Sequence, residues 1–264
     1  MRRTQGKPEG RQLRENRRGE SDLVHRNGKW YLLATCETPE AAPNGHPAGW
    51  LGVDLGIANI ATTSDEGTPF AGEELNRYRA SALRTRAELQ ATGTKSAKRK
   101  LKQRAGREAR HAAQVNHKIA KSIVAEAQRT GRGIALEKLT GIRERARLRK
   151  PQRATYHSWS FAQLGRFIAY KAKRAGIPVI HVDPAYTSQR CSWCGHIDKA
   201  NRPSQELFIC WSCGIVAHAD HNAARNIASL AKVIWGAVNR PHAAQSSPPV
   251  ATVAASPPRR GAGR

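Results

Sequence analysis

The chain has 264 residues and a formal net charge of +25, with 45 lysines and arginines against 20 acidic residues. A charge of this size opposes a compact fold unless a polyanion neutralises it, and it favours nucleic acid as the partner. A membrane partner is disfavoured, because no apolar run could span a bilayer and no basic amphipathic helix has aromatic anchors. No targeting segment is visible, so we expect a cytoplasmic, nucleoid-associated protein of bacterial type.

The N-terminal part predicts an arm, a hairpin and a linker. Residues 1–21 are almost all polar or charged and predict a disordered basic arm. Residues 22–35 predict a β-hairpin with Asn27 and Gly28 in its type I′ turn, because β-forming residues flank this pair. An isolated hairpin is marginal in water, so this one needs a partner sheet. Residues 39–47 are rich in proline, glycine and asparagine and predict a linker.

A second unit begins at Trp50. Residues 50–56 predict an apolar strand with Asp54 in its middle, and residues 59–63 predict its hairpin partner, followed by a short strand near Phe70. A buried strand with one aspartate and a hairpin partner is typical of the start of an RNase H-like sheet. The glycines around Asp54 permit close approach of a ligand or a phosphate backbone.

Residues 74–91 and 95–130 predict two long helices with a break at 92–94. The second helix is dense in cations and has only a thin apolar stripe. It could be a solvated surface helix, but its charge has one sign, which favours contact with phosphates. The basic loop at 140–155 extends this surface. The candidate nucleic-acid contacts are Lys98, Arg99, Lys102, Arg104, Arg107, Arg110, Arg147, Arg149 and Arg153.

The remaining elements alternate between strand and helix. Residues 133–139 predict a strand that contains Glu137, residues 158–175 an amphipathic helix, and residues 177–182 a further buried strand. A last helix is expected from about 219 to 235. The segment 241–264 is rich in proline, serine and alanine and predicts a disordered tail.

Four of the five cysteines form two Cys-x-x-Cys pairs, each followed by glycine. This spacing predicts one tetrahedral Zn²⁺ held by four thiolates. Two disulfides are the alternative, but the odd cysteine count and the absence of an apolar signal segment argue against an oxidising compartment. Ribbons of this type are structural, so the zinc is not expected to be catalytic. The predicted ligands are Cys191, Cys194, Cys210 and Cys213.

Three acidic residues stand at distinctive positions: Asp54 within a strand, Glu137 at a strand end and Asp220 at a helix start. Taken alone, Glu137 could be at the exposed end of an edge strand. Asp220 alone could be a charge that the helix dipole favours. Buried carboxylates are costly unless they are paired or bind a metal, and hard oxygen ligands select Mg²⁺ or Mn²⁺. Together the three predict a two-metal site for phosphodiester hydrolysis.

These motifs in this order resemble the TnpB/OrfB family of transposon-encoded RNA-guided DNA nucleases, which are related to compact type V CRISPR effectors. The resemblance covers about residues 22–235. It rests on G-V-D-L-G-I at 52–57, I-A-L-E-K-L at 134–139, the segments 158–172 and 182–196, and A-D-H-N-A-A-R-N-I at 219–227.

The resemblance implies an α/β fold of RNase H-like (RuvC-type) with a mixed sheet at 49–240, a helical-hairpin insertion at 74–130 and a four-cysteine zinc ribbon at 186–217. It implies that Asp54, Glu137 and Asp220 form the catalytic triad and that DNA and a guide RNA are the partners. The helical insertion would contact the guide–target duplex, and the ribbon would deliver the target strand to the triad. Positions Ser160, Tyr186, Ser188 and Arg225 match residues around the same cleft, without assigned roles.

Two departures from the family pattern affect the expected function. Family members begin with a wedge β-barrel and a helical lobe that bind the guide RNA, whereas here residues 22–48 resemble only the last wedge hairpin and its linker. We therefore expect an N-terminally truncated chain, incomplete without that lobe. Many relatives also have Asp-Arg-Asp where this chain has His218-Ala219-Asp220, so the charges beside the third carboxylate differ.

Three functions remain open on this basis. The first is a Mg²⁺-dependent, RNA-guided endonuclease. The second is a non-catalytic zinc-ribbon protein that binds nucleic acid, either a remnant or a regulator of transposition. The third is a transposase with the same fold that joins DNA ends. No residue in the sequence favours strand joining over hydrolysis. The three carboxylates favour the nuclease over the binding protein, because binding alone does not require a buried Asp54.

Overall fold

The computed structural model describes residues 15–239 except 27, 38, 68 and 139–160. Several predictions therefore lie outside the described residues: the arm at 1–14, the tail at 240–264, the position Ser160 and the basic loop with Arg147, Arg149 and Arg153. In the described part of the chain, no helix is long and apolar enough to cross a membrane.

The centre of the molecule is a mixed five-stranded sheet in the order β5-β4-β3-β6-β7. Strands β3, β6 and β7 are parallel neighbours, while β4 pairs antiparallel with both β3 and β5. The predicted strands are thereby confirmed, within a few residues at their ends. The strands are β3 (Trp50–Asp54), β4 (Asn59–Thr63), β5 (Phe70–Ala71), β6 (Gly133–Glu137) and β7 (Val179–Val182).

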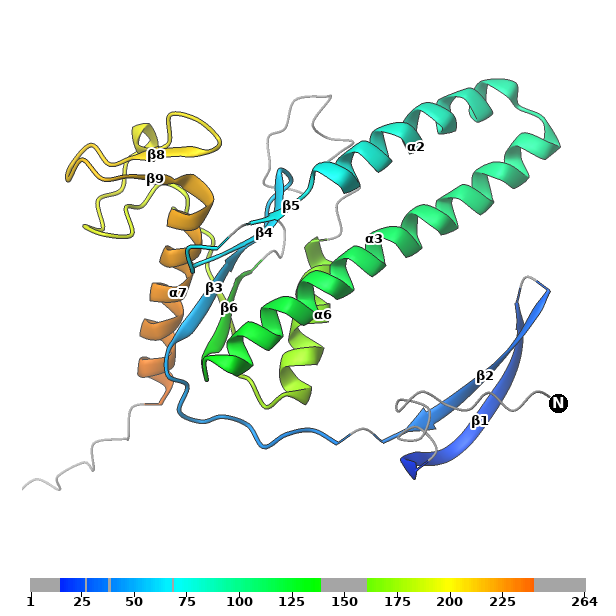
Figure 1. Ribbon diagram of the computed structural model, residues 1–264, viewed down its shortest axis with the longest axis horizontal. Coiled ribbons are helices and arrows are strands. Elements are labelled where there is room, and N and C mark those ends of the chain that lie inside the picture. Colours follow the sequence, from blue (N-terminus) through cyan, green and yellow to red (C-terminus); the bar gives the residue numbers. More distant parts are fainter. Residues whose placement is uncertain (1–14, 27, 38, 68, 139–160, 240–264) are drawn as a thin grey trace, which may run out of the picture.

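Helices cover both faces of this sheet (Figure 1). On one face α3 (Lys95–Arg129) and α6 (Phe161–Arg174) pack against β3 and β6 around a core of Leu51, Ile123 and Ile168. On the other face α7 (Ala219–Val238) packs through Ile227 and Ala231. Both cores consist mainly of aliphatic side chains, which gain stability in proportion to the apolar area that they bury.

Helices α2 (Glu73–Thr92) and α3 form an antiparallel hairpin that projects from the sheet, close to the bounds expected from the sequence. Gly93 ends α2 in the left-handed conformation, with φ 64°. Thr94 begins α3 by accepting a hydrogen bond from the N–H of Ala97 on its side-chain oxygen. Ala120, Ile123 and Ala127 anchor the far end of α3 in the core, so the hairpin is held at its base.

A second, separate sheet is the hairpin of β1 (Arg17–Arg26) and β2 (Lys29–Cys36). The two strands of the predicted hairpin are confirmed, while Asn27 of the predicted turn lies outside the described residues. The prediction of disorder through residue 21 is wrong for residues 17–21. There, cross-strand pairing extends the ladder to Arg17, opposite Cys36, and Arg18 forms an exposed ion pair with Glu37. The disordered arm was predicted from composition alone. Composition does not reveal that residues 17–21 belong to a strand that pairs with β2.

The close approach of α7 to β3 occurs at Gly52. A Cβ atom at this position would lie 1.9 Å from the carbonyl oxygen of Ala224 and 2.7 Å from the nitrogen of Ala228, both in α7. Glycine is therefore required for the helix backbone to lie directly on the strand. This contact places the first turn of α7 above the carboxyl ends of β3 and β6.

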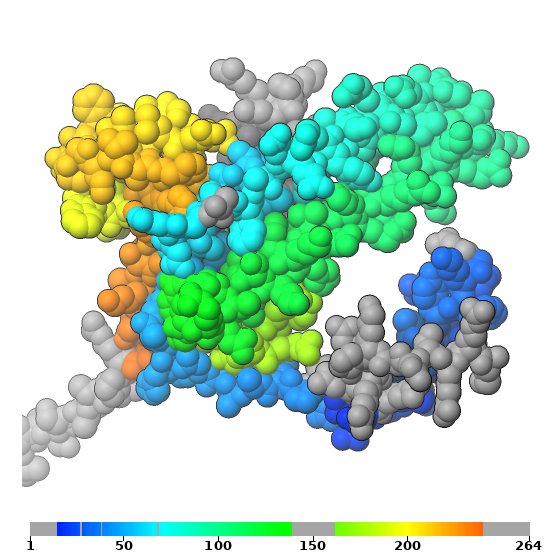
Figure 2. Space-filling model, in the orientation of Figure 1, coloured from blue at the N-terminus to red at the C-terminus, as the bar shows by residue number. Residues whose placement is uncertain are grey.

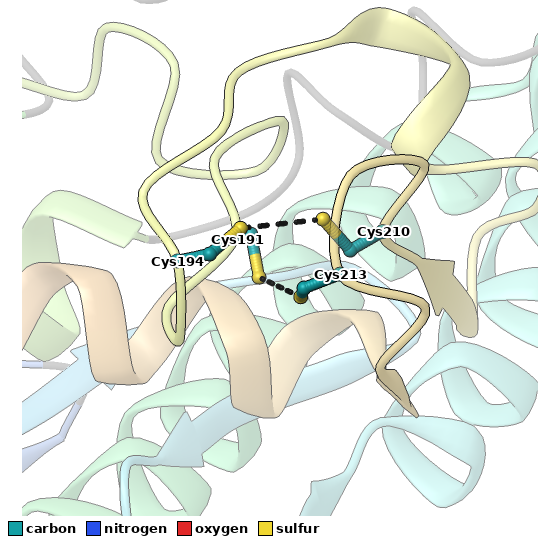
Figure 3. A group of neighbouring side chains, drawn as sticks. All are labelled: Cys191, Cys194, Cys210 and Cys213. Carbon is teal, nitrogen blue, oxygen red and sulfur yellow. Dashed lines mark hydrogen bonds between the residues drawn. The ribbon is translucent and has the colours of Figure 1, made fainter.

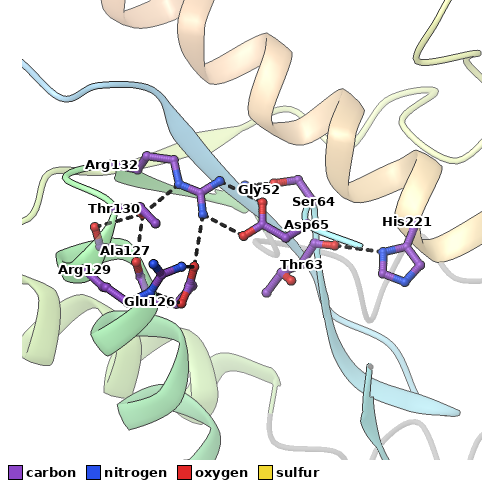
Figure 4. A network of polar contacts seen from close by, with 10 residues as sticks. All are labelled: Gly52, Thr63, Ser64, Asp65, Glu126, Ala127, Arg129, Thr130, Arg132 and His221. Atoms are coloured by element: carbon purple, nitrogen blue, oxygen red, sulfur yellow. Dashed lines mark hydrogen bonds and ion pairs between the residues drawn. The ribbon is translucent and has the colours of Figure 1, made fainter. Parts of the chain in front are cut away.

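A polar network holds the adjoining turn between β4 and β5 (Figure 4). The guanidinium of Arg132 donates two hydrogen bonds to Asp65, at 2.8 and 2.6 Å, and lies 3.6 Å from Glu126 at the end of α3. Arg132 holds the pKa of Asp65 below its ordinary value. On the other side, the side-chain oxygen of Ser64 accepts a hydrogen bond from the N–H of Gly52. The turn thus links α3 to the strand on which α7 lies.

Gly52→Ala tests this contact. We expect it to lower the free energy of unfolding by at least about 2 kcal/mol, because the added methyl group meets helix backbone that cannot rotate away. Urea unfolding followed by circular dichroism measures the change. The control is Gly165→Ala in α6, where an added Cβ meets nothing within 4 Å and better helix propensity should stabilise slightly. Equal stability of Gly52→Ala and the parent would contradict this packing.

Candidate carboxylate and cysteine sites

The three predicted carboxylates come from three elements that meet at one edge of the sheet. Strands β3 and β6 are parallel and in register through Val53 and Leu136, so Asp54 and Glu137 are the next pair at their carboxyl ends. Asp220 is in the first turn of α7. The sheet therefore brings together residues from distant parts of the sequence.

Two side chains hold Asp220 in place. The side-chain amide of Asn59, at the start of β4, donates a hydrogen bond to Oδ2 of Asp220 at 3.0 Å. Arg202 Nη2 donates to Oδ1 at 3.0 Å and forms an ion pair with this carboxylate. Because Arg202 belongs to the cysteine-containing segment, this ion pair joins that segment directly to the carboxylate site.

Glu137 accepts a short hydrogen bond from one side chain among the described residues. The hydroxyl of the buried residue Thr187 donates to Glu137 Oε1 at 2.6 Å. Burial raises the pKa of Glu137, and the hydrogen bond from Thr187 opposes that rise. The preceding residue, Tyr186, adopts φ 63°, a left-handed conformation that costs a non-glycine residue about 1–3 kcal/mol and occurs often at functional sites. The turn that delivers the Thr187 hydroxyl is therefore strained.

Asp54 has the most perturbed carboxyl group of the three. Burial, followed by the negative charges of Glu137 and Asp220, raises the pKa of Asp54 to about 8 against the opposing effects of Arg202 and the N–H of Leu55. Asp54 is thus close enough to both other carboxylates for their negative charges to oppose its ionisation. The three carboxylates do not form a tight cluster, since the cysteines make up the one such group in the described part of the chain whose ligand atoms all lie within 4.8 Å.

Sequence reasoning missed Asn59, Thr187 and Arg202. Each is an ordinary polar residue of a strand end or loop, and each becomes relevant only through a partner far along the chain. Asn59 begins the hairpin partner of the strand that contains Asp54, which is the one signal that could have indicated it. Thr187 lies in the segment 182–196 between the two cleft positions Tyr186 and Ser188, whereas nothing local distinguishes Arg202.

The four predicted zinc ligands converge as expected (Figure 3). The sulfur atoms of Cys194 and Cys210 lie 3.5 Å apart, and those of Cys191 and Cys213 lie 3.7 Å apart. All four are free thiols, so the disulfide alternative is wrong. The cysteines sit in two equivalent turns, closed by Gly195 (φ 79°) and Gly214 (φ 72°), whose N–H groups donate to the carbonyls of Cys191 and Cys210.

The thiols of this cluster cannot all ionise without a cation. Burial opposes ionisation of Cys210, but the N–H groups of Cys213 and Ser212 and the neighbouring thiols outweigh it and lower its pKa to about 6. The N–H of Ile215 favours the Cys213 thiolate, but burial and the other three sulfur atoms raise its pKa to about 12. The cluster can therefore bind a metal such as zinc, which would neutralise the remaining thiolates.

The cysteine-containing segment, which we call the ribbon (residues 186–217), is bound tightly to α7. Its short hairpin of β8 (Leu207–Ile209) and β9 (Val216–His218) leads directly into the helix. Asn222 accepts a hydrogen bond from the N–H of Ser192, and Asn226 donates to the carbonyls of Thr187 and Arg190. The asparagines of the 219–227 motif thus hold the ribbon beside Asp220.

The predicted basic residues of α3 lie on the projecting helical hairpin. Arg99, Lys102 and Arg110 line a groove of about 970 Å³ together with Lys29 and Tyr31 of β2. Arg104 and Arg107 line a smaller hollow facing α2, and Lys98 is exposed. The groove therefore has cationic walls on the side facing the β1–β2 hairpin.

Comparison with known proteins places these features in a family. Residues 161–227 match the family model described as Cas12f1-like, TNB domain. The chain is 34% identical over 226 residues to the CRISPR-associated endodeoxyribonuclease Cas12f1 of Sulfoacidibacillus thermotolerans, covering 79% of this chain and 52% of that protein. It is 30% identical over 222 residues to the putative RNA-guided DNA endonuclease InsQ of Escherichia coli K12, covering 76% and 53%.

The fold is similar to that of a solved Cas12f1–sgRNA–target DNA complex, with a TM-score of 0.55, 19% identity and coverage of 78% of this chain and 55% of that one. The chain spans about half the length of each of these relatives. The resemblance predicted from the sequence motifs is confirmed, and the chain belongs to the family of TnpB-like and Cas12f proteins.

Proposed function

We propose that the chain is the catalytic part of a metal-dependent, RNA-guided DNA endonuclease with an RNase H-like (RuvC-type) domain. The observation that supports this most is the meeting of Asp54, Glu137 and Asp220 at one edge of the sheet. A chain that only bound nucleic acid would gain nothing from placing Asp54 where burial and neighbouring negative charges raise its pKa to about 8.

The donor set fits Mg²⁺ or Mn²⁺. Three carboxylates from β3, β6 and α7 supply hard oxygen ligands, and a divalent cation would offset the burial and the negative charges that oppose ionisation of Asp54. Asp54, Glu137 and Asp220 would hold the ions, which when bound activate water and stabilise the leaving oxygen of a phosphodiester.

Polar side chains of the chain hold the carboxylates of this site in position. Thr187 orients Glu137 through a hydrogen bond of 2.6 Å, while Asn59 and Arg202 fix the two oxygens of Asp220. Asp54 must release its proton before it can bind a cation, because only the ionised carboxylate is a strong ligand. Arg202 also places a positive charge beside the site, where it can contact a phosphate of the substrate.

DNA and a guide RNA are the proposed partners. Relatives that match over about three quarters of this chain are named as an endodeoxyribonuclease and an RNA-guided DNA endonuclease. The net charge of +25 and the cationic groove beside α3 are suited to the phosphates of a duplex. Zn²⁺ is proposed as the structural ion of the ribbon, and Mg²⁺ or Mn²⁺ as the catalytic ions.

Removal of the carboxylates tests the catalytic proposal. Asp54→Asn and Glu137→Gln should each lower Mg²⁺-dependent cleavage of labelled single-stranded DNA by at least about a hundredfold, since each removes a cation ligand. Asp183→Asn is the matched control, because this exposed carboxyl follows the neighbouring strand β7. Cleavage at the parent rate in both triad variants would contradict the assignment of the catalytic triad.

The raised pKa of Asp54 predicts a pH dependence of stability. Its pKa rises on folding from the ordinary 3.8 to about 8, so the protonated form favours the fold and stability is lost as the pH rises through this range. Without added Mg²⁺ or Mn²⁺, Asp54→Asn should therefore stabilise the chain more at high pH than at low pH.

Urea unfolding of the zinc-loaded parent and variant at both ends of this range measures the difference. Added Mn²⁺ should stabilise the parent at the high pH and leave Asp54→Asn unchanged. A stability difference that does not vary with pH would contradict the electrostatic account of the site.

Metal analysis tests the ribbon. We expect one zinc per chain, lost in Cys191→Ser and retained in Cys36→Ser, since Cys36 lies in β2 away from the cluster. Chelation should expose the four cluster thiols to a thiol reagent and lower the unfolding midpoint, because the ribbon packs against Ala219 at the start of α7. Equal zinc content in both serine variants would contradict the four-cysteine site.

A further inference from the structure

The loop between β3 and β4 joins two residues of the carboxylate site. It runs from Asp54, the last residue of β3, to Asn59, the first residue of β4, whose side chain donates to Asp220 at 3.0 Å. The loop is tight at Gly56, where an added Cβ would lie 2.7 Å from the carbonyl oxygen of Asn59. A shift of this loop would therefore move the side chain that holds Asp220, together with the end of the strand that contains Asp54.

The segment that leads into α2 lies directly on this loop. Strand β5 pairs with β4 at Ala71 and Asn59, and the next residue, Gly72, donates its N–H to the carbonyl of Ala58 at 2.8 Å. A Cβ atom at Gly72 would lie 2.7 Å from the carbonyl oxygens of both Ile57 and Ala58. Glycine is therefore required for this approach. Helix α2 begins at the following residue and runs outward from the body of the molecule (Figure 2).

Asn76, in the first turn of α2, adds a side-chain contact to the loop. Its amide nitrogen donates to the carbonyl of Ile57 at 3.0 Å. Leu75 beside it is buried in the main core, against which Ile57 also packs. The first turn of the helix thus holds the loop through one apolar and one polar side chain.

Stability alone does not explain an asparagine at position 76. Oδ1 of Asn76 is buried and has no hydrogen-bond partner among the described residues, and an unpaired buried acceptor costs about 1–3 kcal/mol. Asparagine is also a poorer helix former than alanine or leucine. The side chain instead provides a donor to the loop that leads to Asn59.

We propose that Asn76 is a positioning residue of the carboxylate site. It acts through Ile57 and Asn59: by fixing the loop, it keeps the Asn59 amide within reach of Asp220 Oδ2 and so orients a ligand of the proposed cation. The start of the helical hairpin thereby becomes part of the frame of the site. This inference rests on the proposed function for the cation, whereas the series of contacts from Asn76 to Asp220 can be tested without it.

The first test follows the Asn59 side-chain amide by NMR, in the zinc-loaded chain with isotope-labelled asparagine and without Mg²⁺ or Mn²⁺. The resonance that is missing in Asn59→Ala identifies this amide. Asn76→Ala should shift it toward the position of an exposed amide, because the loop loses its hydrogen bond to α2. Gly72→Ala should shift it in the same way, because the added methyl group displaces the carbonyls of Ile57 and Ala58.

The second test measures Mn²⁺ affinity by electron paramagnetic resonance at constant pH, where the binding that is lost in Asp54→Asn defines the carboxylate site. Asn59→Ala should weaken this binding by about ten- to a hundredfold, as expected for the partner of a metal ligand. Asn76→Ala should weaken it by about three- to tenfold, the effect of one hydrogen bond. Asn59→Ala/Asn76→Ala should bind like Asn59→Ala alone, because Asn76 acts through Asn59. A residue that merely stabilised the fold would instead multiply the two effects.

Matched controls separate positioning from a general loss of structure. Asn44→Ala also removes a side-chain donor to a backbone carbonyl, that of Gly131 before the start of β6. Gly67→Ala adds a methyl group in the turn between β4 and β5, where it meets nothing within 4 Å. Both controls should leave the Asn59 resonance and the Mn²⁺ affinity unchanged. Because alanine is the better helix former, Asn76→Ala should keep the helix content of the parent.

The proposal is overturned if the Asn59 resonance does not move in Asn76→Ala, or if the two alanine substitutions weaken Mn²⁺ binding independently. Absence of Mn²⁺ binding at Asp54 in the parent would instead remove the proposed catalysis. In that case the Asn59 resonance still decides whether Asn76 positions the partner of Asp220. The failure of this inference and the failure of the proposed function are therefore distinguishable.

Discussion

The close contact between α7 and β3 at Gly52 is the constraint on which the rest of the structure depends. With no side chain at this position, the helix backbone lies where a Cβ atom would be 1.9 Å from Ala224 O. The helix therefore begins above the carboxyl ends of β3 and β6, and Asp220 enters the electrostatic environment of Asp54 and Glu137. The ribbon continues directly into the same helix, so one glycine positions both the third carboxylate and the cysteine cluster.

Charge is distributed unevenly over this framework. The chain has an excess of 25 positive charges, yet two carboxyl groups with raised pKa values, Asp54 and Glu137, lie together at the edge of the sheet. The cations concentrate on the projecting hairpin, where α3 lines a groove with Lys29 and Tyr31. Such a separation allows nucleic-acid phosphates to be attracted by one part of the molecule while divalent cations are bound by another. Arg202 is the exception, since it links the ribbon to Asp220.

Features with a local physical signature could be predicted from the sequence. Apolar runs located β3, β6 and β7, the spacing of Cys191, Cys194, Cys210 and Cys213 indicated one cluster, and isolated acids in or beside strands indicated Asp54 and Glu137. The contact at Gly52 could not be predicted, because its cause is the backbone of a helix far along the chain. Sequence reasoning missed three further site residues for the same reason, because each acts through a partner far along the chain. They are Asn59, Thr187 and Arg202. Residues 17–21 were mistaken for a disordered arm because their polar composition does not reveal pairing with β2.

The account depends most on the three carboxylates being one cation site. Anomalous X-ray scattering from crystals of the zinc-loaded chain grown with Mn²⁺ measures this directly. The account predicts manganese bound to Asp54, with Glu137 or Asp220 as further ligands, and zinc confined to the four cysteines. Ordered carboxylates without manganese between them, in crystals where manganese is bound elsewhere, would contradict it.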